Sequence, residues 1–416
     1  MSSRIVFAQK GRRDGLAYPR LWAQTGAHVT LLADCCASSA LDFVPGLRWA
    51  YGRFDPARLC AGLNDLPMSI HSVLGSPVTA CQLYMGRHLG KADGLDRHCF
   101  GDRVFGRWAA DRLQAGGQAN FVAGYSGSSL EFLEAGSKTG AATAVIQVDA
   151  AGSNLDILRG EGSRDCLFFG RSGESYHKYL NRLREEWQKS TVVLVNSAHT
   201  QQCLITQGVP AHKLIIIPIP FFGEIVSASA LEERLNLASG PLKVLYVGSV
   251  SILKGFRYLL EAAKGFKAQE VVFSVVGSRS PSCKDIPIPN NVRLLGRKSR
   301  NELAEVYRQH DVFVFPSLSD GFGLVQLEAM AAGLPVIASP YCGEVVENGI
   351  SGYIVEPRKP NDICQAIGSY VDDRKELFKF GRAALDRVLR YTPGAIVSSF
   401  PGYRQLLPLI NGPESA

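Results

Sequence analysis

The sequence predicts an α/β protein built from two Rossmann-like, doubly wound parallel sheets, each with helices on both faces. Two observations support this: short apolar runs alternate with helical stretches along most of the chain, and glycines follow several of these runs. Such alternation is typical of βαβ units, whose parallel strands are buried on both sides. Because 416 residues are too many for one ordinary core, two domains are expected.

The first half opens as a βαβ unit. A strand near residues 5–8 leads through a basic glycine loop to a helix near 16–24, and a second strand follows near 28–33. No G-x-G-x-x-G follows the first strand, which disfavours a Rossmann dehydrogenase. Later patterns predict strands near 70–74, 120–125, 144–148, 191–196 and 214–218, and helices near 128–136, 176–189 and 199–207.

Residues 218–223 read PIPFFG and are predicted to link the two domains, because the prolines stiffen the segment and the glycine permits a hinge. We expect an N-terminal, acceptor-binding domain over 1–220 and a C-terminal, nucleotide-sugar-binding domain over 221–395. A helix within about 396–416 is expected to pack back on the first domain.

Composition excludes several classes of protein. No stretch approaches the roughly 20 apolar residues of a membrane-spanning helix, and the N-terminal apolar run is too short for a signal peptide. The ten cysteines form no C-x-x-C pair and lie near no histidine cluster. A reduced cytoplasmic setting, structural thiols at Cys35 and Cys36, and no metal site are therefore expected.

The net charge of +7 lies mainly in the first half of the chain. This excess suits an anionic acceptor, or a peripheral contact with the cytoplasmic face of the inner membrane. No nucleic-acid-binding motif accompanies it.

The most specific pattern spans residues 311–338, where strand, glycine loop, helix, glycine stop and strand follow in order. Gly321 and Gly323 let the backbone approach a ligand closely, and the helix that follows begins with unpaired N–H groups and a positive dipole end. Asp320 precedes this end and Glu328 lies inside the helix. Because a carboxylate can accept from two neighbouring hydroxyls, the segment suits an anionic diphosphate with a hydroxylated ring on either side.

This segment resembles the carboxylate-x7-carboxylate signature of retaining family-4 glycosyltransferases (glycosyl transferases group 1), with Asp320 in place of the usual first glutamate. The resemblance runs from about residue 241 to 385 in order and spacing, whereas the first 120 residues match loosely. Its segments are 243–249, Lys254 with Gly255, 272–278, 292–297 and 348–355.

The resemblance implies the GT-B fold, in which two Rossmann-like domains face a cleft and the terminal helix crosses over. It implies a retaining enzyme that moves a sugar from a nucleotide-diphosphate sugar to a hydroxyl acceptor without a cofactor or metal. The acceptor would be a saccharide, a lipid-linked group or a small molecule, in polysaccharide, lipopolysaccharide or glycolipid synthesis.

The resemblance also implies three donor-side roles for side chains. Glu328 would bind the ribose hydroxyls, Asp320 a hydroxyl of the transferred sugar, and Lys254 the donor phosphates, where a fixed cation stabilises the leaving group. The alternatives are a solvated glutamate at Glu328, a turn-capping aspartate at Asp320 and an exposed lysine at Lys254.

Backbone and loop positions complete the implied donor site. Ser249 stands where the family usually has an arginine, and Arg257, Arg279 or Arg297 are candidates to supply that charge. The remaining implied donor contacts are the phosphate loop at Gly248 and Ser249, the N–H groups of Gly321, Phe322, Gly323 and Leu324, and the base contacts Gly277, Arg297 and Lys298.

On the acceptor side, Asp149 ends a strand where the family often has histidine, and it would orient the acceptor or bind the sugar; the alternative is a turn residue. The first loop would approach the diphosphate and acceptor, or else be a solvated turn; it contains Lys10, Gly11, Arg12 and Arg13. His71 follows a candidate strand, where a structural histidine is the commoner case.

Residues 97–114 interleave arginines with Phe100, Val104 and Trp108, which fall at helical spacing. Such a helix either lies on an anionic membrane or packs against the core with solvated arginines.

Two rival functions remain open from the sequence. One is a GT-B enzyme of another reaction, such as a nucleotide-sugar epimerase or hydrolase. The other is an inactive GT-B scaffold that binds a nucleotide or a partner protein.

Overall fold

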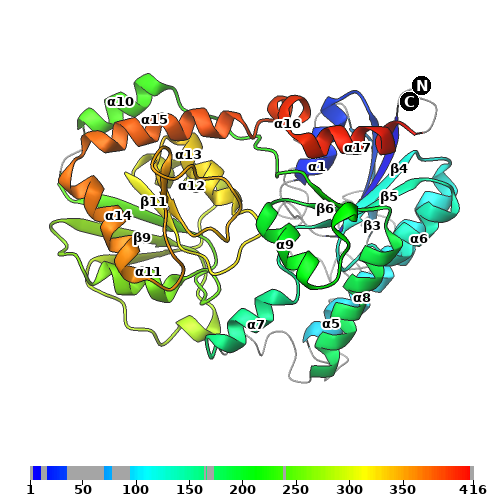
Figure 1. Ribbon diagram of the computed structural model, residues 1–416, viewed down its shortest axis with the longest axis horizontal. Helices are drawn as coiled ribbons and strands as arrows, with labels where there is room; N and C mark the ends of the chain where they lie inside the picture. The colour runs from blue at the N-terminus through cyan, green and yellow to red at the C-terminus, as the bar shows by residue number, and fades with distance from the viewer. Residues whose placement is uncertain are drawn as a thin grey trace, which may run out of the picture.

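The computed structural model describes residues 3–10, 16–34, 70–76, 94–163, 165, 173–237 and 240–412. They form two sheets whose paired strands are all parallel, seen beside each other in Figure 1. The first has seven strands in the order β3-β2-β1-β4-β5-β6-β7, and the second has six in the order β10-β9-β8-β11-β12-β13. The predicted site residues Gly11, Arg12 and Arg13, and also Cys35 and Cys36, lie outside the described residues.

The first sheet and its helices follow the predicted alternation. Its elements are β1 (Arg4–Gln9), α1 (Ala17–Gln24), β2 (His28–Asp34), β3 (Ile70–Ser76), α5 (Gly94–Gly116), β4 (Phe121–Tyr125), α6 (Leu130–Lys138), β5 (Ala142–Gln147), α7 (Ser153–Gly160), α8 (Gly173–Lys189), β6 (Val192–Val195), α9 (Ala198–Thr206), the 3₁₀ helix η4 (Ala211–Lys213) and β7 (Leu214–Ile216). His71 lies within β3.

The second sheet repeats the pattern. Its elements are α10 (Ala228–Leu237), β8 (Leu242–Val247), α11 (Phe256–Ala263), β9 (Val271–Val276), the 3₁₀ helix η5 (Pro281–Cys283), β10 (Val292–Gly296), α12 (Arg300–Arg308), β11 (Val312–Phe315), α13 (Leu324–Ala331), β12 (Val336–Ala338), β13 (Gly352–Ile354), α14 (Pro360–Asp372) and α15 (Lys375–Leu389). Among the described helices, none has the length and apolar character needed to cross a bilayer.

Two helices after the second sheet return to the first sheet (Figure 1). They are α16 (Pro393–Ser399) and α17 (Pro401–Asn411), and α17 contacts β1, β4 and β7. Ser3 Oγ donates to Asn411 Oδ1 at 2.7 Å, so the two ends of the described chain are tied together.

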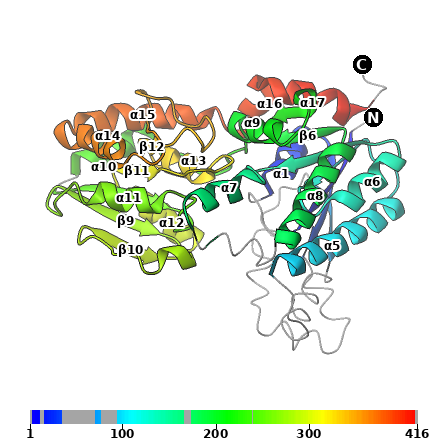
Figure 2. The same cartoon turned by 60° about the horizontal axis from the view of Figure 1, so that its bottom comes forward.

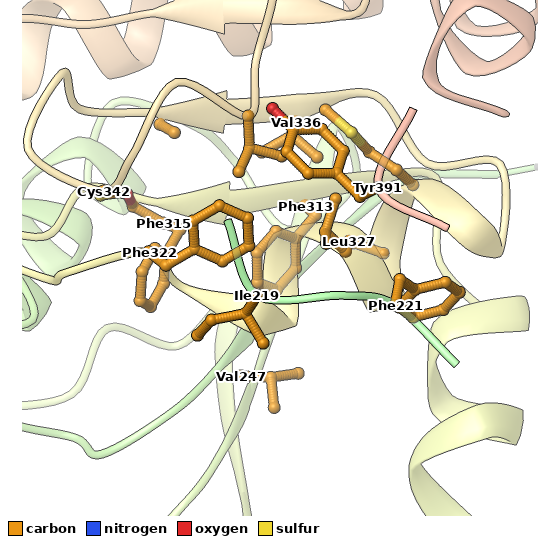
Figure 3. Close-up of a cluster of buried hydrophobic side chains, with 14 of the residues drawn as sticks. Ile219, Phe221, Val247, Phe313, Phe315, Phe322, Leu327, Val336, Cys342 and Tyr391 are labelled. Atoms are coloured by element: carbon orange, nitrogen blue, oxygen red, sulfur yellow. The ribbon is translucent and has the colours of Figure 1, made fainter. Parts of the chain in front are cut away.

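Most of the segment predicted to link the domains is buried, over residues 218–221, whereas Gly223 is exposed. Figure 3 shows Ile219 and Phe221 among side chains of the second sheet, and both are under 8% exposed. The amide of Phe221 donates to the carbonyl of Tyr391 at 2.8 Å. Ile219 and Phe221 therefore belong to the hydrophobic core, and a boundary at residue 220 stays a prediction.

Helix α5 packs through a different face from the one that the sequence suggested. Phe105, Ala109 and Leu113 are buried, whereas Phe100 is 52% exposed. The core-facing stripe lies one residue along from the predicted one, because α6 covers the side of α5 that carries Phe105 and Ala109. The arginines at positions 103, 107 and 112 are exposed.

A buried carboxylate from α8 holds the N-terminus of α6. Glu186 accepts from the amides of Gly127, Ser129 and Leu130 at 2.6, 2.9 and 3.0 Å. The amides of Ser129 and Leu130 are among the N–H groups that the start of a helix leaves without a partner inside the helix. Burial raises the pKa of Glu186 to about 7, although the amides of Gly127 and Ser129 and the nearby Arg182 act to lower it.

Replacing Glu186 with alanine is expected to lower the free energy of unfolding by about 3 kcal/mol, because buried N–H groups lose their acceptor. Chemical denaturation followed by circular dichroism measures this, with the exposed neighbour Glu185→Ala as the matched control. Since the native pKa lies above the ordinary 4.5, the Glu186 contribution to stability falls as pH rises from about 4.5 to 7. Glu186→Gln should lose that pH-dependent part; equal stability of the Ala variants at both positions would contradict the role.

Candidate active site

The best-formed cluster of predicted residues lies where β11 leads into α13. Gly323 caps the helix in the left-handed region, with φ of 66°, a conformation that glycine adopts without strain. The ring of Phe322 is buried and packs edge-on against Tyr391, with ring centroids 5.6 Å apart; Figure 3 shows it in one cluster with Phe315. This packing anchors the loop next to Gly321, the residue that approaches the other sheet.

Asp320 and Lys254 form an ion pair at this helix start. Lys254 Nζ lies 2.6 Å from Asp320 Oδ2 and donates to the carbonyl of Ser319 at 3.1 Å. Asp320 Oδ1 accepts from the amides of Phe322 and Gly323 at 3.2 and 2.9 Å. Asp320 thus caps its own turn, the alternative weighed from the sequence, and also faces the lysine expected to bind phosphate.

The surroundings of Asp320 favour its ionised form. Burial by itself would raise the pKa of this carboxyl, but the Lys254 ammonium and the amides of Phe322 and Gly323 outweigh burial and hold the pKa below its usual value. In the structure, two of the four amides expected to serve the donor are therefore bonded to Asp320. A donor phosphate would compete with this carboxylate for Lys254 and for the helix start.

Glu328 lies one turn after Leu324 on α13 and faces α12. Its Oε2 accepts from the hydroxyl of Tyr307 at 2.9 Å. Burial raises the pKa of Glu328, partly offset by Tyr307 and Arg300. The partly buried carboxylate is thus an oriented hydrogen-bond acceptor rather than a freely solvated group.

The loops after β8 and β9 meet closely. A Cβ on Gly277 would come within 1.8 Å of the Gly248 carbonyl oxygen, so only glycine fits there. Ser249 is exposed, and its carbonyl accepts from the Tyr246 hydroxyl at 2.7 Å. The predicted phosphate loop is therefore a compact turn, and the hydrogen bond from the Tyr246 hydroxyl holds it.

The arginines considered as substitutes for the family's usual arginine have partners of their own or are exposed. Arg257 Nη1 is 3.9 Å from Glu161 Oε2, and Arg279 donates to the carbonyl of Lys284 at 3.1 Å. Arg297 is exposed, and the adjacent Lys298 pairs with Glu302 at 3.3 Å. At the Asp320 turn, Lys254 is the cation that the structure places in direct contact.

A family model described as glycosyl transferases group 1 matches residues 228–387, which contain Lys254, Asp320 and Glu328. Through this segment, the chain is similar to the glycosyl transferases group 1 family.

Curated relatives match part of the chain. D-inositol 3-phosphate glycosyltransferase 2 from Catenulispora acidiphila is 32% identical over 181 residues, covering 39% of this chain and 42% of that protein. D-inositol 3-phosphate glycosyltransferase from Geodermatophilus obscurus is 36% identical over 172 residues, covering 37% and 38%. The match thus spans about two fifths of the length of these relatives.

Solved structures match nearly the whole chain. HepE from Anabaena in complex with UDP is 17% identical, with a TM-score of 0.62, covering 97% of this chain and 98% of that one. Sucrose-phosphate synthase from Thermosynechococcus elongatus is 18% identical, with a TM-score of 0.64, covering 97% and 99%. These similarities confirm the expected GT-B fold.

The first sheet meets the group 1 segment at Gly321. A Cβ on Gly321 would lie 1.7 Å from the Val148 carbonyl oxygen and 2.9 Å from Asn196 Nδ2. Asn196 Nδ2 in turn donates to that same carbonyl at 2.9 Å. The absence of a side chain at Gly321 is therefore what allows the loop of the second sheet to touch the carboxyl ends of β5 and β6.

The two acceptor-side candidates that the structure describes, Asp149 and Lys10, are bonded to their own surroundings. Asp149 Oδ1 accepts from Gln147 Nε2 at 2.8 Å and from the amide of Ala151 at 2.9 Å, which is the turn alternative. Lys10 Nζ lies 2.6 Å from Asp102 Oδ1 on α5. An approach of either residue to an acceptor stays a prediction.

Sequence reasoning missed His199 at the start of α9. Its Nε2 lies 3.4 Å from Ser319 Oγ, and its ring packs on Tyr341 with centroids 5.1 Å apart. Burial lowers the pKa of His199, although Glu344 and Asp320 act to raise it. The signal was its place just after a strand, since strand ends meet ligands in such sheets.

Sequence reasoning also missed Glu161, which follows α7. Its side chain is 6% exposed; it accepts from the Tyr258 hydroxyl at 2.7 Å and from Arg358 Nε at 2.6 Å. Figures 1 and 2 show α7 between the two sheets. Nothing local in the sequence indicates these contacts, since the partners are far apart in the chain.

Among the described residues, no group of three or more His, Cys, Asp or Glu side chains could hold a metal ion.

Proposed function

We propose that the protein is a retaining glycosyltransferase that moves a sugar from a nucleoside diphosphate sugar to a hydroxyl acceptor in polysaccharide, lipopolysaccharide or glycolipid synthesis. The proposal rests above all on the joining of Lys254 and Asp320 at the start of α13, with Glu328 further along the same helix. The match of residues 228–387 to the glycosyl transferases group 1 model supports it.

The diphosphate would take over the contacts that Asp320 now makes. Lys254 and the first amides of α13 would then face the leaving phosphate, where fixed charge and N–H groups stabilise developing anionic charge. Asp320, released from Lys254, would accept from a hydroxyl of the transferred sugar. Glu328 would accept from the ribose hydroxyls.

Transfer with retention would proceed on one face of the sugar. The bond between the anomeric carbon and the phosphate oxygen breaks, the acceptor oxygen bonds to the same face of that carbon, and its proton passes to the leaving phosphate. The approach of Gly321 to Val148 supports a closed site that keeps water from competing with the acceptor.

We also propose that the enzyme works in the cytoplasm with a peripheral contact at the inner membrane. The exposed Phe100 on α5 and the exposed arginines at 103, 107 and 112 support this contact. Sedimentation with anionic vesicles measures it. The R103A/R107A double variant should sediment less than wild type, and equal sedimentation would contradict the contact.

Glu328→Ala is expected to weaken nucleotide binding by about 10- to 100-fold, because charge-assisted hydrogen bonds to the ribose are lost. Thermal shift against UDP, GDP, ADP and their sugars identifies the donor, since a bound ligand raises the melting temperature by mass action. Titration calorimetry of both proteins with that nucleotide then measures the loss.

Glu305→Ala, an exposed glutamate on α12, is the control and should bind like wild type. Sugar released or isomerised without an acceptor would favour a hydrolase or an epimerase. Nucleotide binding without turnover would favour a nucleotide-binding scaffold. No nucleotide binding by the wild type would reject the transferase, the hydrolase and the epimerase, and would leave a scaffold that binds a partner protein.

A further inference from the structure

We propose that Tyr307 is a positioning residue that fixes the Glu328 carboxylate for ribose recognition and so makes the site selective for ribonucleoside over 2′-deoxyribonucleoside diphosphates. The inference rests on the proposed role of Glu328.

The contact between the two side chains is direct and buried. The Tyr307 hydroxyl donates to Glu328 Oε2 at 2.9 Å, and Tyr307 is 3% exposed. The hydroxyl oxygen also lies 3.5 Å from the carbonyl of Val325, one turn before Glu328 on α13. A hydroxyl held at this place sets the rotation of the carboxylate about its terminal bond.

The rest of Tyr307 cannot easily move. Its ring packs on Phe313 of β11, with centroids 6.0 Å apart and an interplanar angle of 56°. Its helix, α12, begins with a full capping box, in which Ser299 and Glu302 each bond the other's backbone amide. The tyrosine therefore reaches Glu328 from a helix that is fixed at its start and wedged against the sheet.

The hydrogen bond leaves the acceptor capacity that two hydroxyls need. An ionised carboxylate offers about four lone-pair positions on two oxygens, and Tyr307 uses one of them on Oε2. Oε1 and the other position on Oε2 remain for the adjacent ribose hydroxyls. A 2′-deoxyribose offers one hydroxyl fewer, so a carboxylate oriented for both should discriminate against it.

The same bond favours the ionised carboxylate. The titratable and charged groups that influence Glu328 in the structure are Tyr307 and Arg300, both on α12. Burial raises the pKa of Glu328, and these two groups lower it in part. Without the hydroxyl the pKa of Glu328 should rise further, so binding should fail at a higher pH as the solution is acidified.

Tyr307→Phe tests this with the ring retained. The matched control is Tyr353→Phe, whose hydroxyl donates to Glu376 at 3.2 Å. Calorimetry across pH 5 to 8 would use UDP and 2′-deoxy-UDP, or the corresponding pair for GDP or ADP if the wild type binds that base.

For Tyr307→Phe we expect about tenfold weaker binding of the ribonucleotide and a smaller ratio between the dissociation constants of the deoxyribonucleotide and the ribonucleotide. The pH at which half of the binding is lost on acidification should be higher than in the wild type. Tyr353→Phe should match wild type. In a Glu328→Gln background, Tyr307→Phe should change binding little, because the carboxylate that it acts on is gone.

The inference would be overturned, and the proposed function left intact, if Tyr307→Phe bound the ribonucleotide like wild type, discriminated equally against the deoxyribonucleotide and lost binding at the same pH. The inference would also be overturned if Tyr307→Phe weakened nucleotide binding equally with and without Glu328→Gln, because its effect would then not depend on the Glu328 carboxylate. If the wild type binds no nucleotide, the proposed function fails and the inference fails with it.

Discussion

Lys254→Ala is expected to lower kcat by about 10²- to 10³-fold, the usual effect of removing one fixed group that stabilises developing charge. The reason lies in the site as the structure presents it. Lys254 contacts Asp320 and the carbonyl of Ser319 at the start of α13, and Ser249 supplies no cation nearby. We expect KM for the donor to rise less than kcat falls, because the leaving phosphate gains charge in the transition state.

Steady-state kinetics with the donor identified by thermal shift measure this effect. Lys375→Ala, an exposed lysine on α15, serves as the control and should match wild type. Lys254→Ala should also shift the acidic limb of the plot of rate against pH to higher pH, because Lys254 helps to hold the pKa of Asp320 down. A kcat within twofold of wild type would exclude Lys254 from leaving-group stabilisation.

Gly321→Ala is expected to reduce transfer by about 100-fold, the scale of loss that a small misplacement of reacting groups produces. The added methyl group would lie 1.7 Å from the Val148 carbonyl oxygen, far inside contact distance. Either the loop carrying Asp320 moves away from the first sheet, or the two sheets separate. Both outcomes disturb transfer, whereas Glu328 and its nucleotide contact are left in place.

The measurement compares turnover with nucleotide affinity. We expect kcat to fall while the affinity for the bare nucleotide stays within about threefold, a small difference in free energy. Gly368→Ala is a suitable control, because a methyl group there would meet no atom within 4 Å. Wild-type turnover in Gly321→Ala would show that this close approach is not part of the working site.

The sequence predicted the elements of the second sheet closely, because buried parallel strands have continuous apolar runs and glycines end the helices between them. The strand and helix around Asp320 are found as β11 and α13. The buried face of α5 was misplaced by one residue, since helical periodicity does not show which neighbour covers a helix.

The site was predictable only in part, for a physical reason. A short pattern identifies Asp320 and Glu328, but it does not reveal what each carboxylate contacts before a ligand arrives. Lys254 lies 66 residues from Asp320 and Tyr307 lies 21 residues from Glu328. Arg358 and Glu161 are separated by 197 residues. Such pairings depend on how whole layers dock, and local periodicity has no signal for them.

The return of α17 to the first sheet also affects how the chain folds during translation. Ser3 and Asn411, which bond to each other, are 408 positions apart, so the ribosome makes one long before the other. The opening strands must therefore wait for the second sheet to be synthesised before α17 can cover them. An apolar surface that stays open for that interval is the place where a chaperone would bind a nascent chain of this design.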